Sequence, residues 1–122
     1  MDRAKIALFE DNPRDREFAR KFLTLFGHEI VVEADNLDDA LTVVEGIADG
    51  THEVDLILLD GNLRPNDNSY NDARKVFGRI TETGVTKTVF GYSLGSLIDN
   101  GIGVKADTYK SYERTRDLIS EI

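Results

Sequence analysis

Polar side chains with the chemistry of an acid, a hydroxyl or an amine follow several apolar segments of this sequence. They are Glu10, Asp11, Asp60, Ser93 and Lys110. In an open parallel α/β sheet, ligands bind beyond the carboxyl ends of the strands. If the apolar segments are strands of one such sheet, we expect these five side chains to lie close together at one edge.

The residue types predict a metal site with phosphoryl-transfer chemistry. Three carboxyl groups brought to one edge repel one another unless a cation neutralises them. An all-oxygen site that keeps several waters suits Mg²⁺, so Glu10, Asp11 and Asp60 predict a magnesium pocket. Beside such a metal, a carboxylate can act as a nucleophile toward a phosphoryl group. A lysine ammonium and a serine hydroxyl can then bind the phosphoryl oxygens.

Each acid also has an ordinary explanation, because Asp and Glu at strand ends often cap helices or solubilise loops. Glu10 and Asp11 alone, or Asp60 alone, would therefore say little about function. Five positions that fall at the ends of four different segments, in the right order, favour a shared site.

The segments that would position these residues alternate between strand-like and helical patterns. Strands are predicted at 4–9, 30–34, 54–59, 86–92 and 104–109, and helices at 13–27, 37–50, 73–84 and after Ser111. Residues 94–100 are expected to form at most a short helix. Such alternation builds a parallel sheet with helices on both faces. The nearly continuous apolar run at 54–59 suits a central strand that is covered on both sides.

Local signals predict the helix starts and the buried face of the first helix. Asn12, Asn36 and Ser111 are expected to be N-caps, and Pro13 suits a first helical position. The apolar residues of the first helix recur at three- and four-residue spacing and are predicted to pack on the sheet. They are Phe18, Ala19, Phe22, Leu23, Leu25 and Phe26. His28 and His52 each lack a partner at metal-ligand spacing, so we expect both at the surface.

The composition is that of an acidic chain of ordinary domain size. Its 122 residues fit one domain, 1–122. Fifteen Lys and Arg against twenty-three Asp and Glu give a net charge of −8, which repels a nucleic-acid backbone. The chain has no cysteine, no apolar run long enough to span a bilayer and no signal-peptide pattern at its first residues. We therefore expect a cytoplasmic protein that binds neither nucleic acid nor membrane directly.

Two segments resemble the receiver domains of two-component response regulators. The stretch 6–13 (IALFEDNP) is similar to the opening strand and acidic pair of that family, and 54–60 (VDLILLD) is similar to its phospho-acceptor strand. The resemblance covers the whole chain. It implies a flavodoxin-like α/β fold, a doubly wound five-stranded parallel sheet in the order 2-1-3-4-5 with helices on both faces.

The same resemblance implies a role for each candidate site residue. Asp60 would be the phospho-acceptor, and Asp11 and Asp60 would bind Mg²⁺ directly, with Glu10 acting through water. Asn62 would offer its backbone carbonyl to the metal. Ser93 would be the switch hydroxyl, and Lys110 would contact the phosphoryl group. Lys105 lies early in the predicted edge strand and would point along the sheet, so we do not expect it to make this contact.

Several positions depart from the family pattern. Pro65 lies one place late in a loop, 61–71, that is longer than usual, and Leu94 replaces a small residue. Ser111 replaces the proline that normally follows the lysine, and Asp107 replaces the switch aromatic, for which Tyr92 and Tyr109 are the candidate substitutes. The interval from Ser93 to Lys110 is short, so we expect a shortened fourth helix. The segment from Leu94 to Tyr109 has the weakest apolar pattern and is predicted to rearrange on phosphorylation.

Three functions are compatible with the sequence. The favoured one is a stand-alone switch in a two-component phosphorelay, which takes a phosphoryl group from a histidine kinase or phosphotransfer protein and signals to a downstream protein, with or without forming a homodimer. The second is a pseudo-receiver that is not phosphorylated and acts as an interaction or dimerisation module. The third is a turnover phosphatase, which needs a second acid two places after its nucleophile. Asn62 stands there, so we expect no turnover enzyme.

Overall fold

Strands and helices alternate along the chain in the computed structural model, which describes residues 1–122. The elements are β1 (Lys5–Phe9), α1 (Pro13–Leu25), β2 (Glu29–Ala34), α2 (Leu37–Ala48), β3 (Leu56–Leu59), α3 (Asn71–Glu82), β4 (Thr88–Gly91), β5 (Ala106–Asp107) and α4 (Tyr112–Ser120). All neighbouring strands are parallel, and their order is β2-β1-β3-β4-β5. The predicted flavodoxin-like fold is therefore confirmed.

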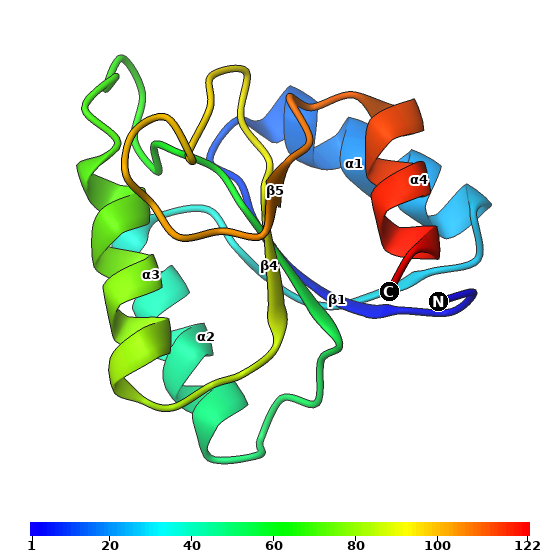
Figure 1. Ribbon diagram of the computed structural model, residues 1–122, viewed down its shortest axis with the longest axis horizontal. Helices are drawn as coiled ribbons and strands as arrows, with labels where there is room; N and C mark the ends of the chain where they lie inside the picture. The colour runs from blue at the N-terminus through cyan, green and yellow to red at the C-terminus, as the bar shows by residue number, and fades with distance from the viewer.

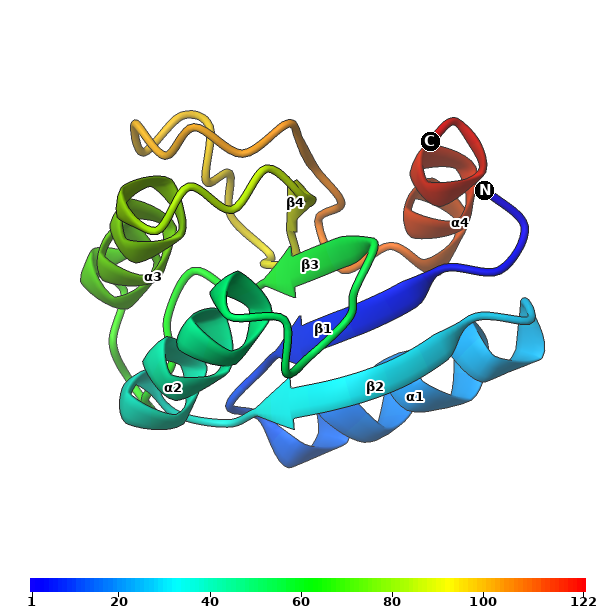
Figure 2. The same cartoon turned by 90° about the horizontal axis from the view of Figure 1, so that it is seen from below.

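The sheet is sandwiched between two helical layers, with α2 and α3 on one face and α1 and α4 on the other (Figures 1 and 2). Because side chains alternate along a strand, β1 and β3 supply both layers. Ala7, Phe9, Ile57 and Leu59 face α2 and α3. Ile6, Leu8, Leu56 and Leu58 face α1 and α4. The central strand β3 is buried on both sides, as its continuous apolar sequence predicts.

Side-chain caps fix the starts of three helices. The Asn12 side chain accepts hydrogen bonds from the backbone N–H groups of Arg14 and Asp15, and Asn36 and Ser111 cap α2 and α4 in the same way. These three N-caps were predicted from the sequence and are confirmed. The helix α3 differs, because Tyr70 precedes it in a left-handed conformation and makes no side-chain cap.

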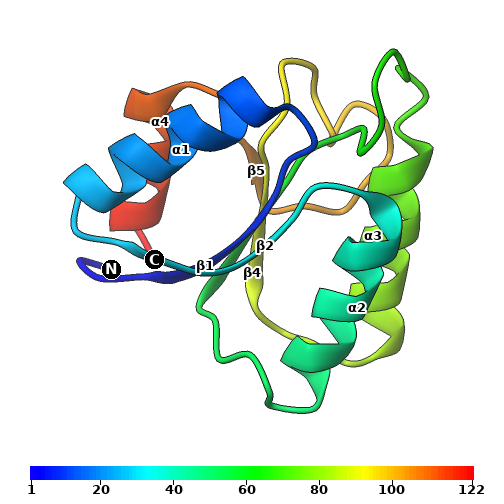
Figure 3. The same cartoon turned by 180° about the vertical axis from the view of Figure 1, so that it is seen from behind.

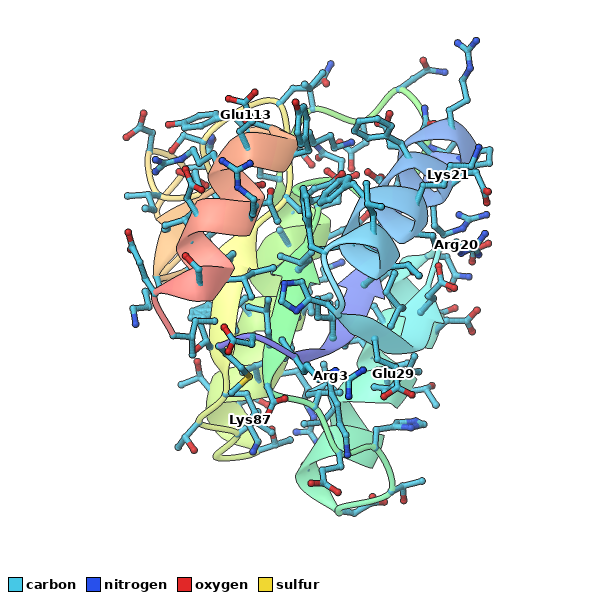
Figure 4. All side chains as sticks on the ribbon, turned by 90° about the vertical axis from the view of Figure 1, so that its right-hand side faces the viewer. Arg3, Arg20, Lys21, Glu29, Lys87 and Glu113 are labelled. Atoms are coloured by element: carbon cyan, nitrogen blue, oxygen red, sulfur yellow. The ribbon has the colours of Figure 1, made fainter.

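The packing of α1 corrects one prediction. Ala19, Phe22 and Leu23 are buried, but Phe18 is 50% exposed and Leu25 is 81% exposed. At about 100° per residue, the buried positions and half-buried Phe26 cover an arc of roughly 100°, and Phe18 and Leu25 lie outside it. Figure 4 looks onto this layer, with Arg20 and Lys21 of α1 and Glu113 of α4 pointing outward.

The link between β4 and β5 corrects a second prediction, because it contains no helix. A turn replaces the expected short helix and is held by the buried carboxylate of Asp107. That carboxylate accepts hydrogen bonds from Ser96 Oγ (2.5 Å) and from the backbone N–H groups of Leu97 (2.8 Å) and Ile98 (3.4 Å). An acid at this position thus ties the link to β5. The expected long last strand is reduced to two residues.

His28 corrects a third prediction, since it is buried rather than at the surface. Its Nδ1 accepts a hydrogen bond from the Ala4 backbone N–H at 3.1 Å. Burial lowers the pKa of His28, and the nearby N-terminal charge acts in the same direction. Separately, none of the four helices is long and apolar enough to cross a membrane.

Candidate functional site

The loops that follow β1, β3, β4 and β5 gather at one edge of the sheet, at the top in Figures 1 and 3. They enclose an open cleft of about 440 Å³. Five of the six predicted site residues line it, namely Asp11, Asp60, Asn62, Ser93 and Lys110. The sixth, Glu10, is fully buried beneath the cleft. The structure therefore brings together the residues that the strand ends predicted.

A compact group of carboxyl side chains forms the floor of the cleft. Glu10, Asp11 and Asp60 each offer one oxygen, and these oxygens lie within 4.8 Å of one another. Asp60 is only 5% exposed and Glu10 is not exposed at all. Burial raises the pKa of Asp60 to about 9, and both a hydrogen bond with Glu10 and the negative charge of Glu10 act in the same direction. Burial also raises the pKa of Asp11.

Lys110 supplies the positive charge of this site. Its ammonium nitrogen lies 2.7 Å from Glu10 Oε1, 2.7 Å from Asp15 Oδ2 and 3.6 Å from Asp60 Oδ2. Burial opposes the charge of Lys110, but the charge of Asp60 and the contacts with Asp15 and Glu10 raise the lysine pKa overall. The buried Glu10 Oε1 therefore has the Lys110 ammonium as its charged partner.

A tight turn aims Lys110 into the cleft. Tyr109 and Lys110 have φ angles of 55° and 56°, and the Ser111 backbone N–H donates to the Thr108 carbonyl at 3.0 Å. Two successive left-handed residues closed by such a bond match a type I′ turn, which is unusual without glycine or asparagine. The Thr108 hydroxyl donates to the Gly91 carbonyl at 2.8 Å and so anchors the turn to β4. Lys105 is exposed and precedes β5.

Ser93 and Asn62 complete the cleft from the ends of β4 and β3. Ser93 is buried, and a Cβ placed on Gly61 would lie 3.1 Å from its Oγ. The hydroxyl therefore lies beside the residue that follows Asp60. The Asn62 side chain accepts a hydrogen bond from the Tyr70 backbone N–H at 2.8 Å. The neighbouring Leu94 is 78% exposed, so its large side chain turns toward solvent.

Among the residues of the cleft that were not predicted as site residues, two bear on its chemistry. Asp15 was expected only to be a favourable acid in the first turn of α1, yet it contacts Lys110. Asp11 precedes the N-cap Asn12, so helical spacing could not relate Asp15 to it, and no local signal indicated the contact with Lys110. Tyr70 also lines the cleft. It belongs to an irregular loop, where no periodicity indicates the direction of a side chain.

The arrangement can bind a hard cation and hold an anion next to a carboxylate. The donor set is all oxygen, which suits Mg²⁺. A phosphoryl group bound beside Asp60 would meet the Lys110 ammonium and the Ser93 hydroxyl.

Comparison with known proteins identifies the fold. The sequence matches no protein-family model and no curated protein. The structure is similar to the signal receiver domain of NarL from Mycobacterium tuberculosis, with 17% identity, a TM-score of 0.73, and 99% of this chain and 96% of the other covered.

Two further solved structures agree. The receiver domain of the histidine kinase CKI1 from Arabidopsis thaliana shows 20% identity and a TM-score of 0.72 over 97% of this chain and 87% of the other. The N-terminal domain of a response regulator/sensory box/GGDEF protein from Carboxydothermus hydrogenoformans shows 16% identity and a TM-score of 0.71 over 96% and 91%. At these identities the likeness shows that the chain has the receiver-domain fold.

Proposed function

We propose that this protein is a phospho-acceptor receiver switch of two-component signalling, in which Asp60 takes the phosphoryl group. The observation that carries the proposal is the buried Asp60 carboxyl at the end of the central strand, with two further acids within 4.8 Å and the Lys110 ammonium 3.6 Å away. In the receiver fold this edge of the sheet is where a ligand would bind. Residues 1–122 make up the switch domain.

Mg²⁺ is the proposed cofactor. Asp11 and Asp60 would hold it directly, Glu10 would act through water, and the Asn62 backbone carbonyl would complete the protein ligands. The close, buried carboxyl group and its all-oxygen donors support this choice. When bound, the ion would neutralise part of the charge on the carboxylates and the phosphoryl oxygens.

The transfer needs Asp60 as a carboxylate. One of its oxygens attacks the phosphorus of a phosphohistidine, the new O–P bond forms, and the P–N bond breaks with its electron pair going to the imidazole. Lys110 and Ser93 bind the phosphoryl oxygens where negative charge builds up. A histidine kinase or a phosphotransfer protein would be the donor. Because such donors are charged from ATP, the switch would act in the cytoplasm.

The output would go to a downstream protein through the surface near β4, β5 and α4, with a homodimer as one form of that output. The protein would catalyse its own phosphorylation and dephosphorylation without turning over another substrate. Asn62 supports this view, because a phosphatase of the aspartyl-phosphate type needs an acid at that place.

A pseudo-receiver is the second candidate, and two observations favour it. Lys110 already pairs with Glu10 and Asp15, so the acids are partly neutralised without a metal. Asp107 stands where the family has its switch aromatic and ties the link between β4 and β5 to the sheet. Such a protein would bind its partner in the same way with or without phosphodonor.

Intact mass spectrometry after incubation with acetyl phosphate and Mg²⁺ separates the two candidates. If the protein is a switch, the wild type gains the mass of one phosphoryl group and the Asp60→Asn variant gains none. The Asp67→Asn variant, a matched control in the same cleft, gains the same mass as the wild type. A wild-type protein that gains no mass under conditions that label a known receiver would support the pseudo-receiver.

A further inference from the structure

The ring of Tyr70 lies between the loop after β3 and the loop after β4. A Cβ built on Gly61 would lie 2.5 Å from the Cδ1 and Cε1 atoms of this ring. A Cβ built on Gly95 would overlap the Tyr70 hydroxyl oxygen. Side-chain carbons do not approach other heavy atoms so closely. The ring therefore occupies space that only two glycines leave open.

The backbone around Tyr70 fixes the ring in that place. Tyr70 has a φ of 61°, a left-handed conformation that non-glycine residues adopt rarely. Its N–H donates to Asn62 Oδ1 at 2.8 Å, and its carbonyl accepts from the Arg74 N–H at 3.1 Å in the first turn of α3. The half-buried ring also packs against the core layer under α2 and α3. The backbone of Tyr70 is thus held on both sides, and its ring is held by packing.

The position of this ring relates it to the chemistry of the cleft. Gly61 directly follows Asp60, and the same Cβ position that meets the ring lies 3.1 Å from Ser93 Oγ. Gly95 lies two residues after Ser93. Tyr70, Asp60 and Ser93 all line the cleft. The ring is therefore a wall of the route to Asp60, between the two loops that carry the acceptor and the hydroxyl.

We propose that Tyr70 is a specificity-determining residue that limits the size of the phosphodonor that reaches Asp60. The inference rests on the proposed function, because it concerns access to the same carboxylate. With the ring between Gly61 and Gly95, an acyl phosphate with a small leaving group reaches Asp60 faster than one with a bulky leaving group. Tyr70 takes no part in the bond changes.

Two acyl phosphates of the same chemistry test the proposal, namely acetyl phosphate and the bulkier benzoyl phosphate. In the reaction with either donor, an Asp60 oxygen forms the new O–P bond, and a carboxylate leaves with the electron pair of the broken P–O bond. The readout is the ratio of the two labelling rate constants, benzoyl over acetyl, followed by intact mass with Mg²⁺ present. A general loss of activity cancels in this ratio, so a merely structural role would not change it.

The expected result is that Tyr70→Ala raises the ratio about tenfold, a typical gain when a pocket stops rejecting a larger group. Gly95→Ala should raise it similarly, because the new methyl expels the hydroxyl end of the ring. In a Tyr70→Ala background, Gly95→Ala should add nothing. In a Tyr70→Phe background its effect should be smaller, since the nearest remaining ring atom, Cζ, would lie 3.1 Å from the methyl and a small shift relieves that contact.

Gly78→Ala is the matched control, because a methyl there meets nothing within 4 Å. An unchanged ratio in both Tyr70→Ala and Gly95→Ala would overturn the role of Tyr70 while leaving the acceptor assignment intact. The same holds if Gly95→Ala acts equally in the Tyr70 and Tyr70→Phe backgrounds. A wild type that takes label from neither donor would instead overturn the proposed function, and the role of Tyr70 with it.

Discussion

The Lys110 ammonium donates a hydrogen bond of 2.7 Å to Asp15 Oδ2, joining the turn after β5 to the first turn of α1 across 95 positions of sequence. The same nitrogen lies 3.6 Å from Asp60. Asp15 therefore competes with any anion on Asp60 for the one lysine of the site. This competition gives the first prediction.

Asp15→Asn is expected to tighten binding of a phosphoryl analogue such as beryllium trifluoride. The substitution removes a negative charge and frees Lys110 for the analogue. Because Asp15 is 40% exposed, solvent screens the effect, and we expect a gain of about two- to fivefold. Titration followed by NMR in Mg²⁺ measures it. Glu17→Gln, which removes a charge from the exposed side of α1, should give no comparable gain.

The affinity for Mg²⁺ is expected to rise with pH. Burial holds the pKa of Asp60 near 9, so the metal-free site keeps a proton that a bound cation must displace. Fewer sites carry that proton as the pH rises from 6 toward 9, and the apparent dissociation constant should fall. Calorimetry in two buffers of different ionisation enthalpy also detects the proton released. Binding with no proton release would contradict this prediction.

Stability without metal is expected to change with pH in the opposite direction. The folded pKa of Asp60 lies above the ordinary value of about 3.9, so the folded state binds the proton more tightly than the unfolded state. This contribution is fully present below pH 4 and is lost as the pH rises toward 9. Urea unfolding with a chelator present should show a weaker decline in Asp60→Asn. Saturating Mg²⁺ should remove the decline from the wild type.

His28 is expected to make the stability of the fold depend on pH in the direction opposite to that of Asp60. Its pKa is lowered by burial, and protonation of Nδ1 would break the bond from the Ala4 N–H. Stability from neutral His28 is present above the unfolded pKa of about 6.5 and is lost as the pH falls below it. His28→Asn keeps an acceptor but cannot titrate, so its unfolding midpoint should stay flatter between pH 7 and 5. Equal slopes for the two proteins would refute the assignment.

Asp107 is expected to control the mobility of the link between β4 and β5. Asp107→Ala leaves the buried Leu97 N–H without its acceptor, which should cost about 1–3 kcal/mol. Hydrogen exchange should accelerate at residues 96–98 and little elsewhere.

If the segment from Leu94 to Tyr109 carries the output, a phosphoryl analogue should also change the hydrogen-exchange protection of that segment. Changes confined to residues 61–71 would move the output to the other side of the cleft.

The parts of the structure that follow from local patterns were predictable. The strand at β3 and the caps Asn12, Asn36 and Ser111 depend on neighbours in the sequence, and they lie where expected. The edge at which Glu10, Asp60 and Lys110 meet follows from the rule for parallel sheets. The fold and the charged centre of the cleft could therefore be predicted from the sequence.

The remaining features depend on contacts between distant segments. Leu25 is exposed because it lies outside the arc of α1 that packs on the sheet, and the apolar residues alone do not indicate where that arc ends. The link between β4 and β5 forms a turn where a helix was expected. The carboxylate of Asp107, about ten residues after the turn, accepts hydrogen bonds from the N–H groups of the turn. The ring of Tyr70 reaches across to Gly95, a contact between two irregular loops. No local pattern encodes these three results.

Peptide mapping after borohydride reduction tests the central claim most directly, because it converts an aspartyl phosphate into homoserine and marks its position. Trypsin separates Asp60 from Glu10 and Asp11, since Arg14, Arg16, Arg20 and Lys21 lie between them. With acetyl phosphate and Mg²⁺, we predict homoserine at position 60 in the wild type and none in Asp60→Asn. Homoserine elsewhere in the wild type, or none at all, would contradict the assignment of Asp60 as the phospho-acceptor.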